Sequence, residues 1–254
     1  MLKNQILRNA IDHLYTFLST QIPIEDKDFY STWFNHYLKI LNLIDISSKK
    51  NALEIGLGFG IIPLSLISMG YKATTIEHPS REFLTPDFIN TFKRHNIHIT
   101  YGDISISLPF KNDSFDLICC CDVIEHLIPW QVPLLLAEIQ RCLKPEGIFI
   151  LSTPNLCRTS NIIRFLAGRM INPPMVPEKF GTTFDHIREY TPGEIKFILK
   201  NSGFQILKTD FGLIPYFDLT RKKHLAKINK FISKMVFLLY KKYGDEIYIK
   251  CKKL

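Results

Sequence analysis

Residues 51–60, NALEIGLGFG, run from a short apolar segment directly into a loop with glycine at every second position. Glycine has no Cβ, so such a loop can turn sharply and let a ligand approach the backbone closely. Apolar residues at helical spacing follow over 61–67, and Gly70 comes next as a helix stop. The stretch therefore predicts a strand, a tight turn and a helix, the first half of a βαβ unit.

The spacing of these glycines distinguishes between nucleotide-binding loops. A dinucleotide-binding loop has the pattern G-x-G-x-x-G, and Ile61 stands where that pattern requires its third glycine. The pattern present is Glu54-x-Gly56-x-Gly58-x-Gly60. It resembles the first motif of the class I S-adenosylmethionine-dependent methyltransferases. The resemblance implies that these four residues help to bind the methyl donor, S-adenosyl-L-methionine.

The composition is that of a globular protein, with 254 residues, 46% hydrophobic and 22% charged. This length suits one α/β domain with a modest extension. No uninterrupted apolar stretch of about 18 residues occurs, and the first residues lack the features of a secretion signal, so we expect a cytoplasmic protein. Three of the six cysteines are consecutive, at 119–121, and none forms a C-x-x-C pair. We expect them to be buried apolar side chains in a reducing compartment.

Residues 1–50 predict two helices, separated by the stretch at 23–28. Each helix carries an apolar stripe at helical spacing. The first stripe comprises Ile6, Leu7, Ile11, Leu14, Tyr15 and Leu18, and the second comprises Trp33, Phe34, Tyr37, Leu38 and Leu41. Two interpretations stay open: a helical cap packed on the sheet edge, and a lid over the substrate, which the resembled family often builds from this region.

Glu77 ends the second predicted strand, residues 71–76. A carboxylate at that position can accept hydrogen bonds from both hydroxyls of a ribose. Glu77 is therefore the strongest single candidate for a donor-binding residue. The alternative is a surface acid in a turn before Pro79.

The third predicted strand, residues 97–101, leads into Gly102-Asp103, then Leu-Pro-Phe at 108–110 and Ser-Phe-Asp at 114–116. The methyltransferase family has the same landmarks in the same order. By that resemblance Asp103 would accept a hydrogen bond from the adenine amino group, and Ile104 would pack on the ring. Taken alone, an Asp after a glycine is more often a turn residue.

The fourth predicted strand, residues 115–121, is apolar on both faces, as a central parallel strand should be. It delivers Asp122, Glu125 and His126 to the carboxyl edge of the sheet, where open α/β sheets bind ligands. Asp122 is a further candidate donor-binding residue. Glu125 and His126 have a second interpretation, in which they only cap and orient the next helix.

Transfer of a methyl group from a sulfonium requires the donor carbon and the acceptor atom to be held in line, with removal of a proton when the acceptor is a hydroxyl. The candidate bases are His126 and His186, with His126 preferred for its place at the sheet edge. We expect no metal. In the alternative, Asp122, Glu125 and His126 bind a divalent cation, because they resemble the Glu-x-x-Glu-His cluster of ubiquinone-pathway and small-RNA O-methyltransferases.

The Leu-Lys-Pro-Glu-Gly segment at 143–147 predicts a turn into a fifth strand at 148–152, with Asn155 beyond it lining the acceptor pocket. Residues 156–190 are too irregular for a packed core and predict a substrate-covering insertion. Within them begins the motif His186-x-Arg-x-Tyr-Thr, which resembles one in small-molecule and sugar-modifying methyltransferases. Thr191 should cap a helix that ends near Gly203. Residues 205–209 and 247–251 predict strands six and seven, the seventh as the antiparallel edge.

The net charge of +8 belongs to one segment, because residues 221–254 carry eleven Lys and Arg against two acids. Residues 221–243 predict an amphipathic basic helix. Its lysines are Lys223, Lys227, Lys230 and Lys234, and its apolar face comprises Ile228, Phe231, Ile232, Met235, Leu238 and Leu239. The interpretations are a helix packed on the sheet with solvated lysines, contact with an anionic membrane, or binding of an anionic or lipid-linked substrate.

Together these patterns predict a Rossmann-like, seven-stranded, mostly parallel sheet with an antiparallel last strand, helices on both faces, and a helical extension at 1–50 before the domain at 51–254. We expect a methyltransferase acting on a small molecule or glycan, most readily at oxygen. The alternatives are an inactive scaffold whose basic helix binds a membrane or partner, and a nicotinamide-dependent oxidoreductase, which the glycine spacing disfavours. No aromatic-rich RNA module accompanies the basic segment, so a nucleic-acid partner is disfavoured.

Overall fold

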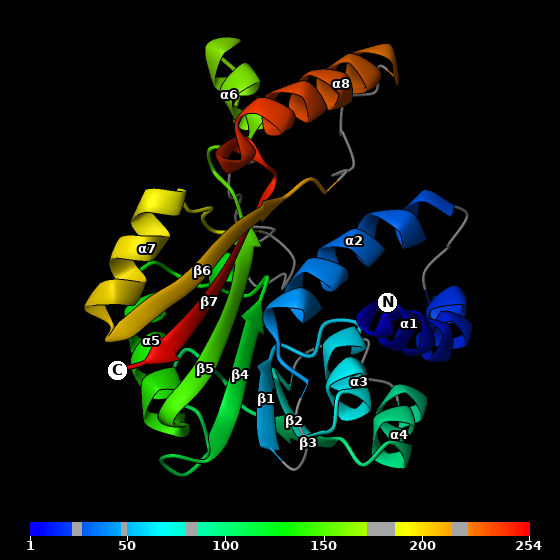
Figure 1. Ribbon diagram of the computed structural model, residues 1–254, viewed down its shortest axis with the longest axis vertical. Helices are drawn as coiled ribbons and strands as arrows, with labels where there is room; N and C mark the ends of the chain where they lie inside the picture. The colour runs from blue at the N-terminus through cyan, green and yellow to red at the C-terminus, as the bar shows by residue number, and fades with distance from the viewer. Residues whose placement is uncertain (22–26, 47–49, 80–85, 172–185, 215–222) are drawn as a thin grey trace.

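The computed structural model describes residues 1–21, 27–46, 50–79, 86–171, 186–214 and 223–254, without the side chains at 13–32, 87–88 and 223–230. Seven strands form one sheet in the order β3-β2-β1-β4-β5-β7-β6 (Figure 1). The strands are β1 Lys50–Ile55, β2 Tyr71–Glu77, β3 His98–Tyr101, β4 Phe115–Cys121, β5 Leu143–Pro154, β6 Phe204–Gly212 and β7 Glu246–Lys253. Only β7 runs antiparallel to its neighbours, so the predicted Rossmann-like sheet is confirmed.

The position of β7 differs from the prediction of an antiparallel edge. It lies between β5 and β6, and β6 is the edge strand. The burial of β7 explains this, because Ile247, Tyr248 and Ile249 are all buried on consecutive positions. An edge strand would alternate, as β6 does in part.

Helices cover both faces of the sheet (Figure 1). One face carries α1 Leu2–Gln21, α2 Lys27–Leu43, α3 Ile61–Ser68 and α4 Pro86–Arg94, and the other carries α5 Gln131–Cys142 and α7 Pro192–Asn201. The helices α6 Thr159–Leu166 and α8 Lys223–Leu239 lie beyond the carboxyl end of the central strands. Two short 3-10 helices, η1 Ile124–His126 and η3 Lys241–Tyr243, complete the elements.

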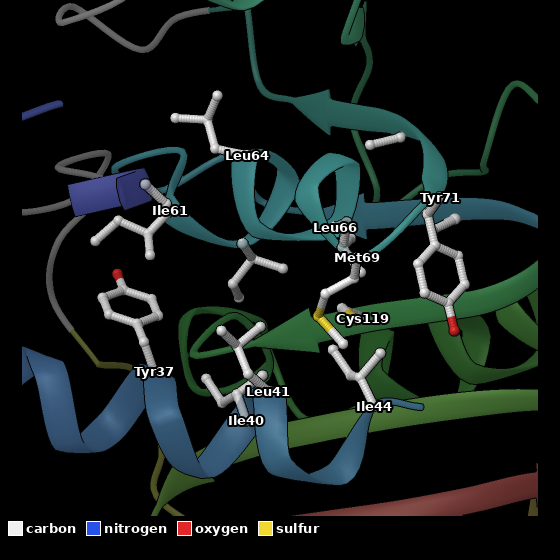
Figure 2. Packing of buried hydrophobic residues seen from close by; sticks show 14 of the residues in the cluster. Tyr37, Ile40, Leu41, Ile44, Ile61, Leu64, Leu66, Met69, Tyr71 and Cys119 are labelled. Carbon is white, nitrogen blue, oxygen red and sulfur yellow. The ribbon is translucent and has the colours of Figure 1, made fainter. Parts of the chain in front are cut away.

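The two predicted amino-terminal helices are present and pack on a face of the sheet. The side chains of Tyr37, Ile40 and Leu41 in α2, and of Ile44 just after it, are buried against α3 and the strands (Figure 2). The same helix contacts β5, β6 and β7. Fully burying an Ile or Leu stabilises a fold by about 1.5 to 3 kcal/mol, so α2 is part of the core.

Four of the six cysteines are buried, and Cys121 and Cys157 are half-buried. All six thiols are free, and Cys119 and Cys120 point into the two hydrophobic clusters on opposite faces of the sheet. Burial raises the pKa of both thiols well above the ordinary value. These two residues therefore serve the core and not thiolate chemistry.

Two segments are more ordered than predicted. Strand β5 begins at Leu143, and the following Lys-Pro-Glu-Gly segment forms an irregularity within the strand instead of a turn before it, since Phe115 pairs with Leu143 and Leu117 with Ile148. The expected insertion at 156–190 contains helix α6, whose first turn buries Asn161. Its residues 172–185 lie outside the described part of the chain.

The amphipathic helix expected at 221–243 is present as α8, but its described side chains do not fit the interpretation in which the apolar face packs on the sheet. Phe231, Met235, Leu238 and Leu239 are exposed, whereas Ser233 is buried. The helix contacts α6 and η3. Polar Ser233 therefore lies on the face of the helix that packs inward. The side chains of Lys223, Lys227, Ile228 and Lys230 are outside the described residues.

Candidate active site

The glycine loop after β1 has the conformation that its sequence requires. Gly56, Gly58 and Gly60 have φ values of 81°, 51° and 78°, a region that other residues rarely adopt. A Cβ at Gly60 would lie 2.1 Å from Cζ of Phe92 in α4, and one at Gly56 would lie 2.8 Å from Cγ2 of Val123. A Cβ at Gly58 would meet no atom within 4 Å. Two glycines thus allow close packing, and the middle one leaves its backbone open to a ligand.

Glu77 is joined to this loop by main-chain donors. Its Oε2 accepts from Leu57 N at 2.9 Å and its Oε1 from His78 N at 2.8 Å, and the side chain is only 5% exposed. Parallel pairing of β1 with β2 brings the two strand ends together. Each carboxylate oxygen has a second lone pair, so both can also accept from a ligand hydroxyl. Glu54 is buried within β1, two residues before the loop.

Asp103 and Ile104 follow β3, the strand next to Glu77. Asp103 is exposed, and its Oδ1 accepts from Ser105 N at 2.9 Å, the turn that its sequence indicated. Hydrogen bonds from Ser105 lower the pKa of Asp103. Ile104 is half-buried against the second hydrophobic cluster. Both residues therefore lie along the same strand edge as the loop.

Asp122 directly follows β4 and has a left-handed backbone, with φ 55°. Its Oδ1 accepts from Ser152 Oγ at 2.7 Å, and its Oδ2 lies 3.0 Å from His36 Nε2. Burial by itself would raise the pKa of Asp122, but the attraction of His36 and the hydrogen bonds from His36 and Ser152 lower it to about 2. The half-buried carboxyl is therefore ionised at neutral pH.

His36 is a site residue that the sequence reasoning missed. It lies in α2, is buried, and places Nδ1 3.0 Å from the hydroxyl of Tyr248 while Nε2 faces Asp122. Its only signal in the sequence is a histidine between the apolar positions of an amphipathic helix. The pairing depends on where α2 meets the sheet, which local pattern does not specify.

Glu125 connects η1 to the segment before α7. Its carbonyl oxygen accepts from Ile187 N at 2.7 Å and Arg188 N at 3.1 Å, and its Oε2 accepts from Thr153 Oγ1 at 3.0 Å. Burial raises the pKa of Glu125 well above the ordinary value, and the charge of Asp122 raises it further. The side chain is thus a neutral hydrogen-bonding group, which matches the interpretation that it orients neighbouring structure.

The two candidate histidines, 60 residues apart in sequence, lie side by side. The ring centroids of His126 and His186 are 5.0 Å apart in an edge-to-face arrangement. His186 Nδ1 lies 3.6 Å from Glu189 Oε1. Burial opposes ionisation of Glu189, but its pKa is lowered by His186, by Arg158 Nη1 at 2.7 Å and by Asn161 Nδ2 at 2.9 Å.

The residues of the alternative cation cluster are divided between two groups. Among the described residues, ligand atoms of Glu125, His126 and His186 lie within 4.8 Å of one another, and so do those of His36, Asp122 and Glu246. The predicted trio of Asp122, Glu125 and His126 is not such a group there. Asn155, expected at the acceptor pocket, is instead buried and uses Nδ2 to bind Lys242 O and Gly244 O.

Comparison with known proteins agrees with the fold and the loop. A family model described as a methyltransferase domain matches residues 29–209. The ubiquinone biosynthesis O-methyltransferase of Rickettsia canadensis is 26% identical over 200 residues, which cover 79% of this chain and 80% of that protein. The protein of the same name from Rickettsia bellii is 28% identical over 154 residues, 61% of each chain, so the match spans less than two thirds of that relative. The crystal structure of a SAM-dependent methyltransferase from Archaeoglobus fulgidus has a TM-score of 0.56 and 20% identity, covering 94% of this chain and all of that one, a likeness in fold alone.

Proposed function

The chain belongs to the methyltransferase-domain family, and from that premise we propose that it transfers a methyl group from S-adenosyl-L-methionine to an oxygen of a small-molecule acceptor. The observation that carries this proposal is one continuous strand edge. It holds a glycine loop open at Gly58, a buried carboxylate bonded to that loop, and a pair of histidines supported by a carboxylate.

The residues present suit this donor. The backbone at Gly58 can be approached without a clash, and Glu77 keeps acceptor capacity for two ribose hydroxyls. We assign the adenine amino group to Asp103 and the ring contact to Ile104. Asp122, ionised beside His36, suits the ammonium group of the methionine part. Glu54, Gly56 and Gly60 would shape the loop around the donor.

The chain's own part in the reaction is to align the acceptor and remove its proton. When bound, the donor supplies a methyl group that its sulfonium already activates. We assign removal of the acceptor's proton to His186. The Glu189 carboxylate near its Nδ1 favours the tautomer in which Nε2 can accept a proton. His126, beside it, would orient the acceptor hydroxyl. The order of preference between the two histidines thus reverses the expectation from sequence.

Two features support oxygen of a small molecule as the acceptor. A hydroxyl acceptor needs a base to take its proton during the transfer, and the histidine pair can supply one. The relatives with the highest similarity reported above are named O-methyltransferases of ubiquinone biosynthesis. A glycan hydroxyl would use the same base and is the alternative acceptor class.

Thermal unfolding in saturating S-adenosylhomocysteine, beside NAD, tests the donor site in the wild type and in Glu77→Ala. Ligand at about 100 times its dissociation constant adds roughly 2.7 kcal/mol, a midpoint rise of several degrees. We expect a rise with the adenosyl ligand only, reduced in the variant. Labelled-methyl transfer to a panel of phenols and glycans then tests the acceptor. A rise with NAD alone, or binding without transfer to any acceptor, would overturn the proposal.

A further inference from the structure

Helices α6 and α8 contact each other beyond the carboxyl end of the sheet (Figure 1). The exposed residues of α8 whose side chains are described, at 231, 232, 234, 235, 238 and 239, lie on one broad helix face. The opposite face is anchored, since Ser233 is buried and a Cβ at Gly244 would lie 2.8 Å from Cε2 of Phe237. The outward face of α8 is therefore set by packing on its other side.

Both helices turn large apolar side chains to solvent. We call these exposed residues the α6–α8 surface: Phe165, Leu166, Phe231, Met235, Leu238 and Leu239. Phe165, Leu166 and Leu239 are 72%, 79% and 73% exposed. Burying such side chains is favourable because it removes apolar surface from water. Apolar side chains gathered on touching helices are typical of an interaction site.

The charge of the same segments indicates what the surface contacts. Residues 221–242 contain eight Lys and Arg and no acid, and residues 156–171 contain three Arg and no acid. Arg169, Lys234, Lys241 and Lys242 are exposed. Apolar residues combined with cations suit an anionic lipid surface, in which both classes of side chain find partners. A second copy of the chain would bring like charges together.

The surface is connected to the acceptor side of the site. Arg158, immediately before α6, and Asn161 in its first turn hold Glu189, which faces His186. Asn155 at the end of β5 holds the carbonyl of Lys242, just after α8. A bilayer on the α6–α8 surface would thus lie on the same side of the molecule as the histidine pair.

We propose that the α6–α8 surface docks this protein onto an anionic lipid bilayer, with its apolar side chains at the headgroup boundary and its Lys and Arg on lipid phosphates. Within the described part of the chain, no helix is long and apolar enough to cross a membrane, so the helices would lie in the interface. This docking needs neither donor nor acceptor, and its test does not depend on methyl transfer.

Vesicle flotation of the full chain tests the proposal. The vesicles are phosphatidylcholine alone, or with about a third phosphatidylglycerol. We expect the wild type to float with the anionic vesicles and binding to fall about tenfold or more in Phe231→Ser/Leu238→Ser/Leu239→Ser. Lys234→Gln/Lys241→Gln/Lys242→Gln should lose only the preference for anionic lipid, as should the wild type in about 0.5 M salt.

The matched control is Leu134→Ser/Phe197→Ser, which removes exposed apolar side chains from α5 and α7 on another face. It should float like the wild type, and far-ultraviolet circular dichroism should show that all variants are folded. Equal flotation of the control and the α8 apolar variant would overturn the proposal. So would a wild-type dimer in gel filtration that the apolar variant converts to monomer, without vesicle binding by either form.

Discussion

The proposed donor side of the site is held mainly by main-chain atoms, whereas the proposed acceptor side is held by side chains from distant elements. Gly56 N bonds Ile76 O, Leu57 N bonds Glu77, and Gly102 N bonds the Glu77 carbonyl, all between neighbouring strand ends. On the proposed acceptor side, Arg158 and Asn161 reach Glu189, whose carboxylate faces His186. The main-chain geometry of the donor side depends on the positions of its glycines, so it can be predicted from the sequence. The acceptor side depends on how distant elements pack, which the sequence pattern does not specify.

Substitution of His186 should have the largest effect and tests the acceptor side. His186→Gln keeps a polar side chain but removes the base, so we expect methyl transfer to fall about 10²- to 10⁴-fold, with donor binding unchanged. Steady-state kinetics and the thermal shift with S-adenosylhomocysteine measure the two separately. His98→Gln, an exposed histidine on β3, is the control and should keep the wild-type rate. A His186→Gln rate within about threefold of wild type would remove His186 from the mechanism.

The glycine loop offers a sharper test of the donor side. Gly60→Ala should cost about 3 kcal/mol in the free energy of unfolding, because its Cβ would overlap Phe92 and its φ is positive. Gly58→Ala carries the same kind of backbone strain without the overlap and should cost about 1 kcal/mol. Gly58→Ala should nevertheless abolish the thermal shift with S-adenosylhomocysteine. Urea unfolding measures both costs, and equal costs would mean that Phe92 moves aside freely.

Asp245 makes the stability of the fold sensitive to pH. It is buried, accepts from Ile214 N at 3.0 Å, and burial raises its pKa to about 6. The unfolded carboxyl titrates near 3.9, so between about pH 4 and 6 the unfolded state releases its proton first and the folded state loses stability. The isosteric Asp245→Asn does not titrate. Relative to wild type it should therefore gain about 2 to 3 kcal/mol as the pH rises from 4 to 7.

Urea unfolding at both pH values measures this gain. Parallel stability profiles for the wild type and Asp245→Asn would show that the carboxyl is solvated in the folded state.

His36 should have the smallest effect, because it acts through Asp122. His36→Asn removes the partner that lowers the Asp122 pKa, so the carboxyl should protonate at a higher pH. We expect binding of S-adenosylhomocysteine to weaken about tenfold near pH 5 and by less at pH 7. Asp122→Asn should remove this pH dependence in both backgrounds. Calorimetric titrations that show the same pH profile for His36→Asn and the wild type would exclude the link.

The sequence by itself determined the strands, the glycine loop and the caps. Thr191 accepts from Glu194 N at 3.2 Å as the cap of α7, and Gly203 has the positive φ of a helix stop. Each of these features is decided by residues within a few positions of one another, through periodicity, turn chemistry and the absence of a Cβ. For that reason the elements on the donor side of the sheet were predicted with their boundaries nearly correct.

Only the tertiary structure decided what depends on distant partners. It placed β7 between β5 and β6, brought His36 to Asp122, and set His186 beside His126. It also turned the apolar face of α8 outward, against the usual expectation for an amphipathic helix. In each case a strand, a side chain or a helix face could contact several different partners. The free energy of the whole packed fold decides which of these contacts forms. The local sequence pattern does not specify which contact forms.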